Sequence, residues 1–175
     1  MQKEGHTGLQ RPFYSESTVA EHTFALILSL SRPIHKSHER TRRGDFSCED
    51  THGFELKEKT LGVVGTGNIG SQVIRIGKGF AMKILAYDKY PNRKFQDELG
   101  FEYADSTRLL KEADIITLHL PLNQETHHLD KERRRMMKKG AIVINTASGG
   151  PIDTTIQNIS LFIEGKNQNI IPPLR

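Results

Sequence analysis

The sequence of Leu61–Gly70, LGVVGTGNIG, combines three structural signals. An apolar, β-branched run leads directly into a G-x-G-x-x-G motif, and this order predicts a buried strand, a tight turn and the start of a helix. Gly65 permits the sharp turn, Gly67 lets a pyrophosphate approach the backbone, and Gly70 lets the helix pack closely on the strand. Because the N-terminus of that helix offers N–H groups and a partial positive charge, we expect a phosphate-bearing ligand there.

The chain after this motif alternates between apolar strands and helices. Its strands are apolar on both faces, which indicates a parallel sheet covered by helices on both sides. Right-handed crossovers then give a doubly wound, Rossmann-type α/β fold with three α/β/α layers. After the strand at Leu61–Val64, further strands are expected at Lys83–Asp88, Phe101–Ala104, Ile115–Leu120 and Ala141–Ala147. Helices are expected at 69–80, at Phe95–Leu99, from Asp105 or Ser106, at Lys131–Lys139 and after Asp153. The first of these helices should place Ile69, Val73, Ile76 or Gly77, and Phe80 on one face.

Two helices are expected ahead of the glycine turn. Glu16–Ser31 is apolar over most of its circumference in its second half, so we expect it to pack on the sheet and also on another subunit or domain. Ile34–Arg43 is polar and should present a solvated face. In the loop that follows, Phe46, Cys48 and Phe54 are expected to act as anchors.

Asp88 supplies the second element of the expected ligand site. It ends the strand that follows the glycine turn, 18 residues after Gly70. An acid at this place accepts hydrogen bonds from the ribose diol of adenosine. It also disfavours a 2′-phosphate, because two like charges about 4 Å apart repel by on the order of 4 kcal/mol at an effective dielectric near 20. The combination predicts NAD rather than NADP, against the alternative of a solvated acid at a strand end.

Composition limits the classes of function. The chain has 175 residues, a net charge of +4 and a pI near 9.2, which suits an anionic small molecule but is too diffuse to indicate nucleic acid. The single cysteine, Cys48, excludes an internal disulfide and fits a reducing, cytoplasmic location. The longest apolar run, Phe24–Leu30, is too short for a membrane span, and Met1–Gln10 has no signal-peptide pattern.

Other reactive or charged clusters have simpler explanations. Adjacent histidines point apart, so a metal site at His127 and His128 is not expected. His35, His38 and Glu39 have helical spacing, but a solvated helix face accounts for them. The basic run Lys131–Lys139 lacks the interleaved aromatic residues of a nucleic-acid surface. We therefore predict no metal.

Four motifs occur in order along the chain. They are SESTVAEHT at 15–23, KTLGVVGTGNIG at 59–70, HLPL at 119–122 with Thr126 following, and NTA at 145–147 with Gly149 and Gly150. Together they resemble the D-isomer-specific 2-hydroxyacid dehydrogenases, in particular the D-lactate dehydrogenase-like or phosphoglycerate dehydrogenase-like enzymes. The resemblance covers about residues 13 to 154 and implies the NAD-binding domain of a two-domain enzyme that acts on a 2-hydroxy acid and forms a homodimer.

The resemblance also implies roles for individual residues and an organisation for the chain. Residues 1–14 would be a remnant or linker, 15–58 the inter-domain and dimer helix with its loop, and 59–175 the dinucleotide-binding domain, whose C-terminal end can be incomplete. Cofactor-binding roles carry over to Gly65, Gly67, Asn68, Ile69 and Gly70 at the pyrophosphate, Asp88 at the ribose, His119 and Pro121 at the adenine and ribose wall, Thr126 as a polar contact, and Thr146 and Ala147 beside the nicotinamide.

One departure from the family separates binding from catalysis. Ser148 stands where the family has the arginine that binds the substrate carboxylate and polarises the carbonyl, so no catalytic residue is assigned here. The family's catalytic acid and histidine would lie beyond residue 175. Two functions are therefore considered: an NAD-dependent oxidoreductase that transfers hydride between NAD(H) and a 2-hydroxy or 2-oxo acid, represented by its cofactor-binding domain, and a non-catalytic NAD(H)-binding or sensing module that dimerises.

Overall fold

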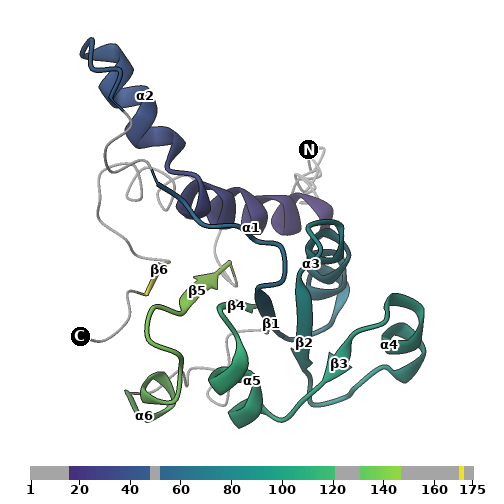
Figure 1. Ribbon diagram of the computed structural model, residues 1–175. Coiled ribbons are helices and arrows are strands. Elements are labelled where there is room, and N and C mark those ends of the chain that lie inside the picture. Colours follow the sequence, from purple (N-terminus) through teal and green to yellow (C-terminus); the bar gives the residue numbers. More distant parts are fainter. Residues whose placement is uncertain (1–15, 48–51, 121–130, 147–169, 172–175) are drawn as a thin grey trace, which may run out of the picture.

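A computed structural model describes residues 16–47, 52–120, 131–146 and 170–171, and all that follows refers to these. Within them one sheet has the strand order β3-β2-β1-β4-β5-β6 (Figure 1). The first five strands pair in parallel, which confirms the doubly wound sheet, while β6 adds an antiparallel edge next to β5 that was not expected. The strands are β1 Thr60–Val64, β2 Lys83–Tyr87, β3 Glu102–Tyr103, β4 Ile115–Leu118, β5 Ile142–Asn145 and β6 Ile170–Ile171.

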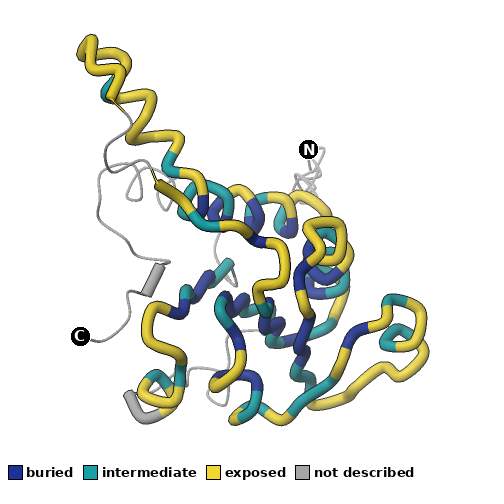
Figure 2. The backbone as a smooth tube through the Cα atoms, in the orientation of Figure 1, coloured by how far each residue is buried: buried dark blue, intermediate teal, exposed yellow. Residues whose placement is uncertain are grey.

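Helices cover both faces of the sheet. On one face α1 (Glu16–Ser31) and α3 (Asn68–Gly79) pack over a buried cluster that includes Phe24 and Val73. On the other face a second cluster forms around Leu109 of α5 (Ser106–Glu112), with α6 (Lys131–Arg135) beside it. The three-layer arrangement is therefore confirmed (Figure 1). The central residues of β1, β2, β4 and β5 are dark blue in Figure 2 because they are buried between the layers.

The buried face of α3 agrees with the predicted one at Val73 and Gly77, and Ile69 and Ile76 pack partly against the same core. Gly70, Val73, Ile74 and Gly77 are buried, whereas Phe80 lies beyond the helix end, partly exposed, and stacks on Phe24 of α1 at 5.5 Å between ring centroids. Gly70 and Gly77 are buried because this helix packs closely on β1. A Cβ at position 77 would lie only 2.9 Å from a methyl carbon of Leu61. Gly77 therefore lets α3 lie directly against β1, and Ile74 is a buried position that the predicted face did not include.

Short helices and turns mostly follow their expected signals. The Asp105 carboxylate caps α5 by accepting the Arg108 N–H at 2.9 Å, so Asp105 and not Ser106 is the cap. The helix α4 (Arg93–Leu99) ends at Gly100 in the left-handed region, φ +60°. The basic helix α6 is shorter than predicted, and the helix expected after Asp153 lies outside the described residues.

The helix α2 (Ile34–Arg42) extends away from the rest of the fold and has no buried residue (Figures 1 and 2). In the segment after it Phe46 is 79% exposed, so the prediction that Phe46 anchors this loop is wrong. Phe54 does pack against the core, and Cys48 lies outside the described residues. The polar sequence of α2 explains its position, because it offers the core no apolar stripe to bury.

Candidate functional site

The turn between β1 and α3 has the tight geometry that its glycines predict. Gly65 has φ +92°, and a side chain there would also meet the His119 carbonyl oxygen at 2.9 Å. A Cβ at Gly70 would overlap the carbonyl group of Gly65, so the helix start lies directly on the turn. Gly67, the residue before α3, has open space where a Cβ would be. The N-terminus of α3 is therefore accessible to an anion through Gly67.

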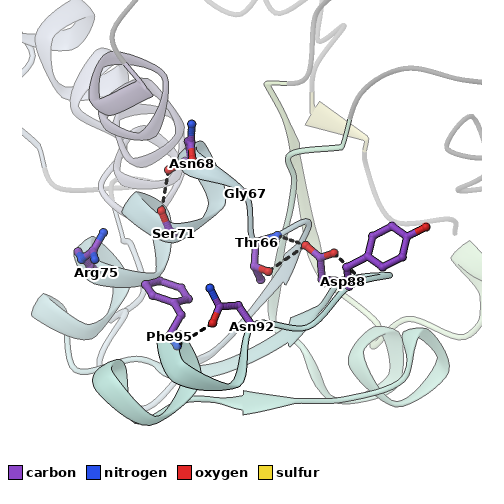
Figure 3. Close-up of a pocket in the computed structure, with 9 residues that line it drawn as sticks. Thr66, Gly67, Asn68, Ser71, Arg75, Asp88, Asn92 and Phe95 are labelled. Atoms are coloured by element: carbon purple, nitrogen blue, oxygen red, sulfur yellow. Dashed lines mark hydrogen bonds between the residues drawn. The ribbon is translucent and has the colours of Figure 1, made fainter.

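Asp88 lies directly against this turn, as the sequence predicts. Its Oδ2 accepts the Thr66 N–H at 2.6 Å and the Thr66 hydroxyl at 2.9 Å, and its Oδ1 accepts the Tyr90 N–H at 2.9 Å (Figure 3). Partial burial opposes ionisation of Asp88, but these hydrogen bonds outweigh it and hold the pKa of the carboxyl below its usual value. Asp88 is thus an ionised acceptor beside the glycine turn.

A cleft of about 450 Å³ joins the turn and the acid. Its walls include residues that the sequence motifs did not identify. The Arg75 guanidinium lies 5.3 Å from the centre of the Phe95 ring and pairs with Glu98 at 3.6 Å. The lining residues, all drawn in Figure 3, are Thr66, Gly67, Asn68, Ser71, Arg75, Asp88, Tyr90, Asn92 and Phe95.

Three of these wall residues could have been found from the sequence. Thr66 lies inside the glycine motif, and Ser71 and Arg75 follow at helical spacing from Gly67. Tyr90, Asn92 and Phe95 gave no such signal, because they reach the cleft only when the segment after β2 folds back toward α3. At the start of α3 the Asn68 side chain donates a hydrogen bond to the Glu16 carboxylate of α1, while Ile69 packs partly against the core.

His119 follows β4 and adjoins the same turn. Its backbone N–H donates to the Val64 carbonyl oxygen at 2.8 Å. Its Nε2 is buried and has no hydrogen-bond partner among the described residues. Burial lowers the pKa of His119 to about 4, so the imidazole is neutral at physiological pH.

The burial of His119 predicts acid-sensitive stability. Below the ordinary pKa of 6.5 the unfolded chain binds a proton that the folded chain rejects down to about pH 4. The free energy of unfolding should therefore fall as the pH drops through this window, by up to about 3 kcal/mol at 1.36 kcal/mol per pKa unit. Urea unfolding at pH 7 and pH 5 measures the slope. His119→Gln should remove most of it, and an unchanged slope in this variant would contradict the assignment.

Thr146 follows β5 and connects it to α1. Its hydroxyl lies 3.1 Å from that of Thr23, which is fully buried and donates to the Val19 carbonyl oxygen at 2.9 Å. Since Thr23 has one hydroxyl proton and uses it on Val19, Thr146 is the donor between them. The remaining residues singled out in the sequence, Pro121, Thr126, Ala147 and Ser148, lie outside the described residues.

The site as described fits a dinucleotide. A pyrophosphate can approach the open backbone at Gly67, and a ribose diol can reach Asp88 in the same cleft. Within the described residues no three His, Cys, Asp or Glu side chains are grouped closely enough to hold a metal ion. In the same part of the chain no helix is long and apolar enough to cross a membrane.

Comparisons with known proteins agree with this geometry. The family described as D-isomer specific 2-hydroxyacid dehydrogenase, NAD binding domain, matches residues 24–156. D-lactate dehydrogenase of Escherichia coli is 43% identical over 160 residues, which are 91% of this chain and 47% of the relative. A 2-hydroxyacid dehydrogenase homolog of Haemophilus influenzae is 45% identical over 82% of this chain and 43% of its own length.

Solved structures give the same result. The apo-structure of D-lactate dehydrogenase from Escherichia coli has a TM-score of 0.74 and 41% identity, covering 89% of this chain and 49% of that one. D-lactate dehydrogenase from Aquifex aeolicus, complexed with NAD and lactic acid, has a TM-score of 0.73 and 42% identity, covering 89% of this chain and 47% of that one. The chain thus spans about half the length of the relatives it matches.

Proposed function

Because the chain belongs to the D-isomer-specific 2-hydroxyacid dehydrogenases and comprises their NAD-binding domain, we propose that it provides the cofactor site of an NAD-dependent oxidoreductase for a 2-hydroxy acid. The observation that carries the proposal is the placement of Asp88 against the glycine turn, within one cleft. Relatives that include D-lactate dehydrogenases support the reaction class. Bound NAD would supply a hydride acceptor, and its reduced form a hydride donor, for the interconversion of a 2-hydroxy acid and a 2-oxo acid.

The residues of this chain would hold and orient the cofactor. The α3 N-terminus at Gly67 and Asn68 would face the pyrophosphate, and Asp88 would accept hydrogen bonds from the adenosine ribose. His119 is proposed to form part of the adenine and ribose wall as a neutral, half-buried side chain. Thr146, held by α1, is proposed to contact the nicotinamide end. From their positions in the sequence, Pro121 is proposed to belong to the same wall as His119, Thr126 to make a polar contact to the cofactor, and Ala147 to lie beside the nicotinamide.

Two measurements on the purified chain test the proposed function. NADH is titrated while nicotinamide fluorescence is recorded, and NADH oxidation is then followed with pyruvate as a 2-oxo acid. Saturable binding supports the cofactor site. Binding without turnover, unchanged after Ser148→Arg, would assign this chain to the non-catalytic module, whereas turnover would show that it carries a catalytic set. Absence of binding at millimolar NADH would contradict the proposal.

We further propose that the chain forms a homodimer through α1 and α2. The helix α2 buries none of its residues within the described part of the chain, and Ile34 is 66% and Phe46 79% exposed. A second copy of this helix and its loop would cover these apolar groups. The same proposal divides the chain into an inter-domain segment at 15–58 and a dinucleotide-binding domain at 59–175. We also propose a cytoplasmic location.

The dimer predicts a mass twice the 19.8 kDa of one chain. Ile34→Glu combined with Phe46→Glu should reduce the mass to one chain, because each carboxylate would be buried in the interface without a partner. Light scattering after size exclusion measures both masses. Met136→Glu, at the 38%-exposed Met136 beside α6, serves as the control and should remain dimeric. A monomeric wild-type chain would contradict the proposal.

A further inference from the structure

A chain of hydrogen bonds connects β3 to the glycine turn. The Tyr103 hydroxyl lies 2.9 Å from the Thr66 hydroxyl, which in turn lies 2.9 Å from Asp88 Oδ2. On its other side the Tyr103 oxygen accepts the Asn92 N–H at 3.2 Å. Asn92 also begins α4, where its side chain accepts the Phe95 N–H at 3.1 Å (Figure 3). Three segments that are separate in the sequence, the glycine turn, the connection from β2 to α4 and β3, therefore meet at the Tyr103 and Thr66 hydroxyls.

The number of protons available on the hydroxyl groups fixes the direction of this series of hydrogen bonds. An ionised carboxylate only accepts hydrogen bonds, so the Thr66 hydroxyl uses its one proton on Asp88. Tyr103 must then donate to Thr66, and the Asn92 N–H can only donate to Tyr103. Each bond points toward the Asp88 carboxylate, and aligned hydrogen bonds of this kind strengthen one another.

Tyr103 is itself held in place by aromatic packing. Its ring contacts Phe101 edge-on, with 5.0 Å between centroids, and Phe101 contacts Phe95 in the same way at 5.4 Å. Phe95 lines the cleft. The hydroxyl of Tyr103 is therefore presented to Thr66 from a rigid support, and the same support forms part of the cleft wall.

We propose that Tyr103 is a positioning residue for the cofactor: acting through Thr66, its hydroxyl orients the Asp88 carboxylate for the adenosine ribose before the ligand arrives. This inference rests on the proposed function, because it requires NAD to bind in this cleft. Thr66 lies between Gly65 and Gly67, so the same link also ties the pyrophosphate-binding turn to the ribose acceptor. Fixing these groups in advance lowers the ordering cost of binding.

The test compares NADH with its analogue that carries 2′-deoxyadenosine. Tyr103→Phe removes the hydroxyl and keeps the ring, and we expect NADH affinity to fall about 3- to 10-fold, the worth of one neutral hydrogen bond. Affinity for the 2′-deoxy analogue should fall less, since that ligand has lost one of the two ribose hydroxyls that can donate to Asp88. A structural role alone would weaken both ligands equally. Tyr87→Phe, on β2 and packed into the cluster on the opposite sheet face, is the matched control.

A second set of variants keeps the test independent of the folding of Tyr103→Phe. Thr66→Val should reproduce the selective loss and Thr66→Ser should retain NADH affinity. The double variant Tyr103→Phe/Thr66→Val should be no worse than Thr66→Val, because Tyr103 acts through Thr66. If wild type binds NADH while Tyr103→Phe binds both ligands as wild type does, or weakens both equally, only this inference fails. If wild type does not bind NADH, the proposed function fails first.

Discussion

Asp88→Ala is expected to weaken NADH binding by about 10- to 100-fold, the worth of a hydrogen bond to a charged group. The carboxylate is an ionised acceptor in the cleft, and its loss also leaves the Thr66 N–H without its partner at 2.6 Å. The variant should bind NADPH relatively better than wild type does, because the negative charge that repels a 2′-phosphate is gone. Fluorescence titration with both cofactors measures the two effects.

The matched control for Asp88→Ala is Asp105→Ala. Asp105 is also an aspartate that caps backbone N–H groups, but it serves α5 and does not line the cleft. Its replacement should cost about 1 kcal/mol of stability and leave NADH affinity unchanged. Equal NADH affinity in wild type and Asp88→Ala would remove Asp88 from the site.

Gly70→Ala is expected to give the largest loss of stability. Its Cβ would overlap the Gly65 carbonyl group, which is backbone and cannot rotate away. Relief requires α3 to move away from the turn, so we expect a loss of about 3 kcal/mol or more in the free energy of unfolding, at the upper end for overpacked sites. NADH binding should be lost with the turn. Urea unfolding followed by circular dichroism provides the measurement.

Alanine substitutions at two further glycines in the same region serve as controls for Gly70→Ala. A Cβ added to Gly79, at the end of α3, would meet no atom of the described residues, and Gly79→Ala should raise stability by about 0.5–1 kcal/mol through helix propensity. Gly67→Ala has the same open space around it, so it should fold with at most about 1 kcal/mol of loss at this cap position. It should nevertheless weaken NADH binding, because its methyl group occupies the approach to the α3 N-terminus. Wild-type stability in Gly70→Ala would contradict the close packing described.

The fold could be predicted from sequence because its signals are local and repeated. Apolar strands alternate with helices, and the glycine motif marks the first crossover. Asp88 could be placed because the end of one parallel strand lies beside the end of its neighbour. The strand β6 was not predicted, because a two-residue antiparallel strand at the sheet edge has no pattern of its own.

The parts that could not be predicted depend on contacts between distant segments. In α3 the predicted face missed Ile74, which is buried although it lies outside the spacing of positions 69, 73, 76 or 77, and 80. Phe46 was misjudged because an aromatic residue in a loop carries no signal of whether the core reaches it, and its ring stays largely exposed. The link between Tyr103 and Thr66 spans 37 positions and joins two hydroxyls, a pairing for which the sequence carries no spacing signal.

Amide chemical-shift mapping with NADH would decide whether the dinucleotide binds on the glycine turn and at Asp88, on which the proposed function depends. On addition of NADH to the isotope-labelled chain, we expect the largest shifts at the amides of Thr66, Gly67, Asn68 and Ser71, and of Asp88 at the end of β2. Shifts confined to other surfaces, such as α2, or no shifts at millimolar NADH, would contradict binding at this site.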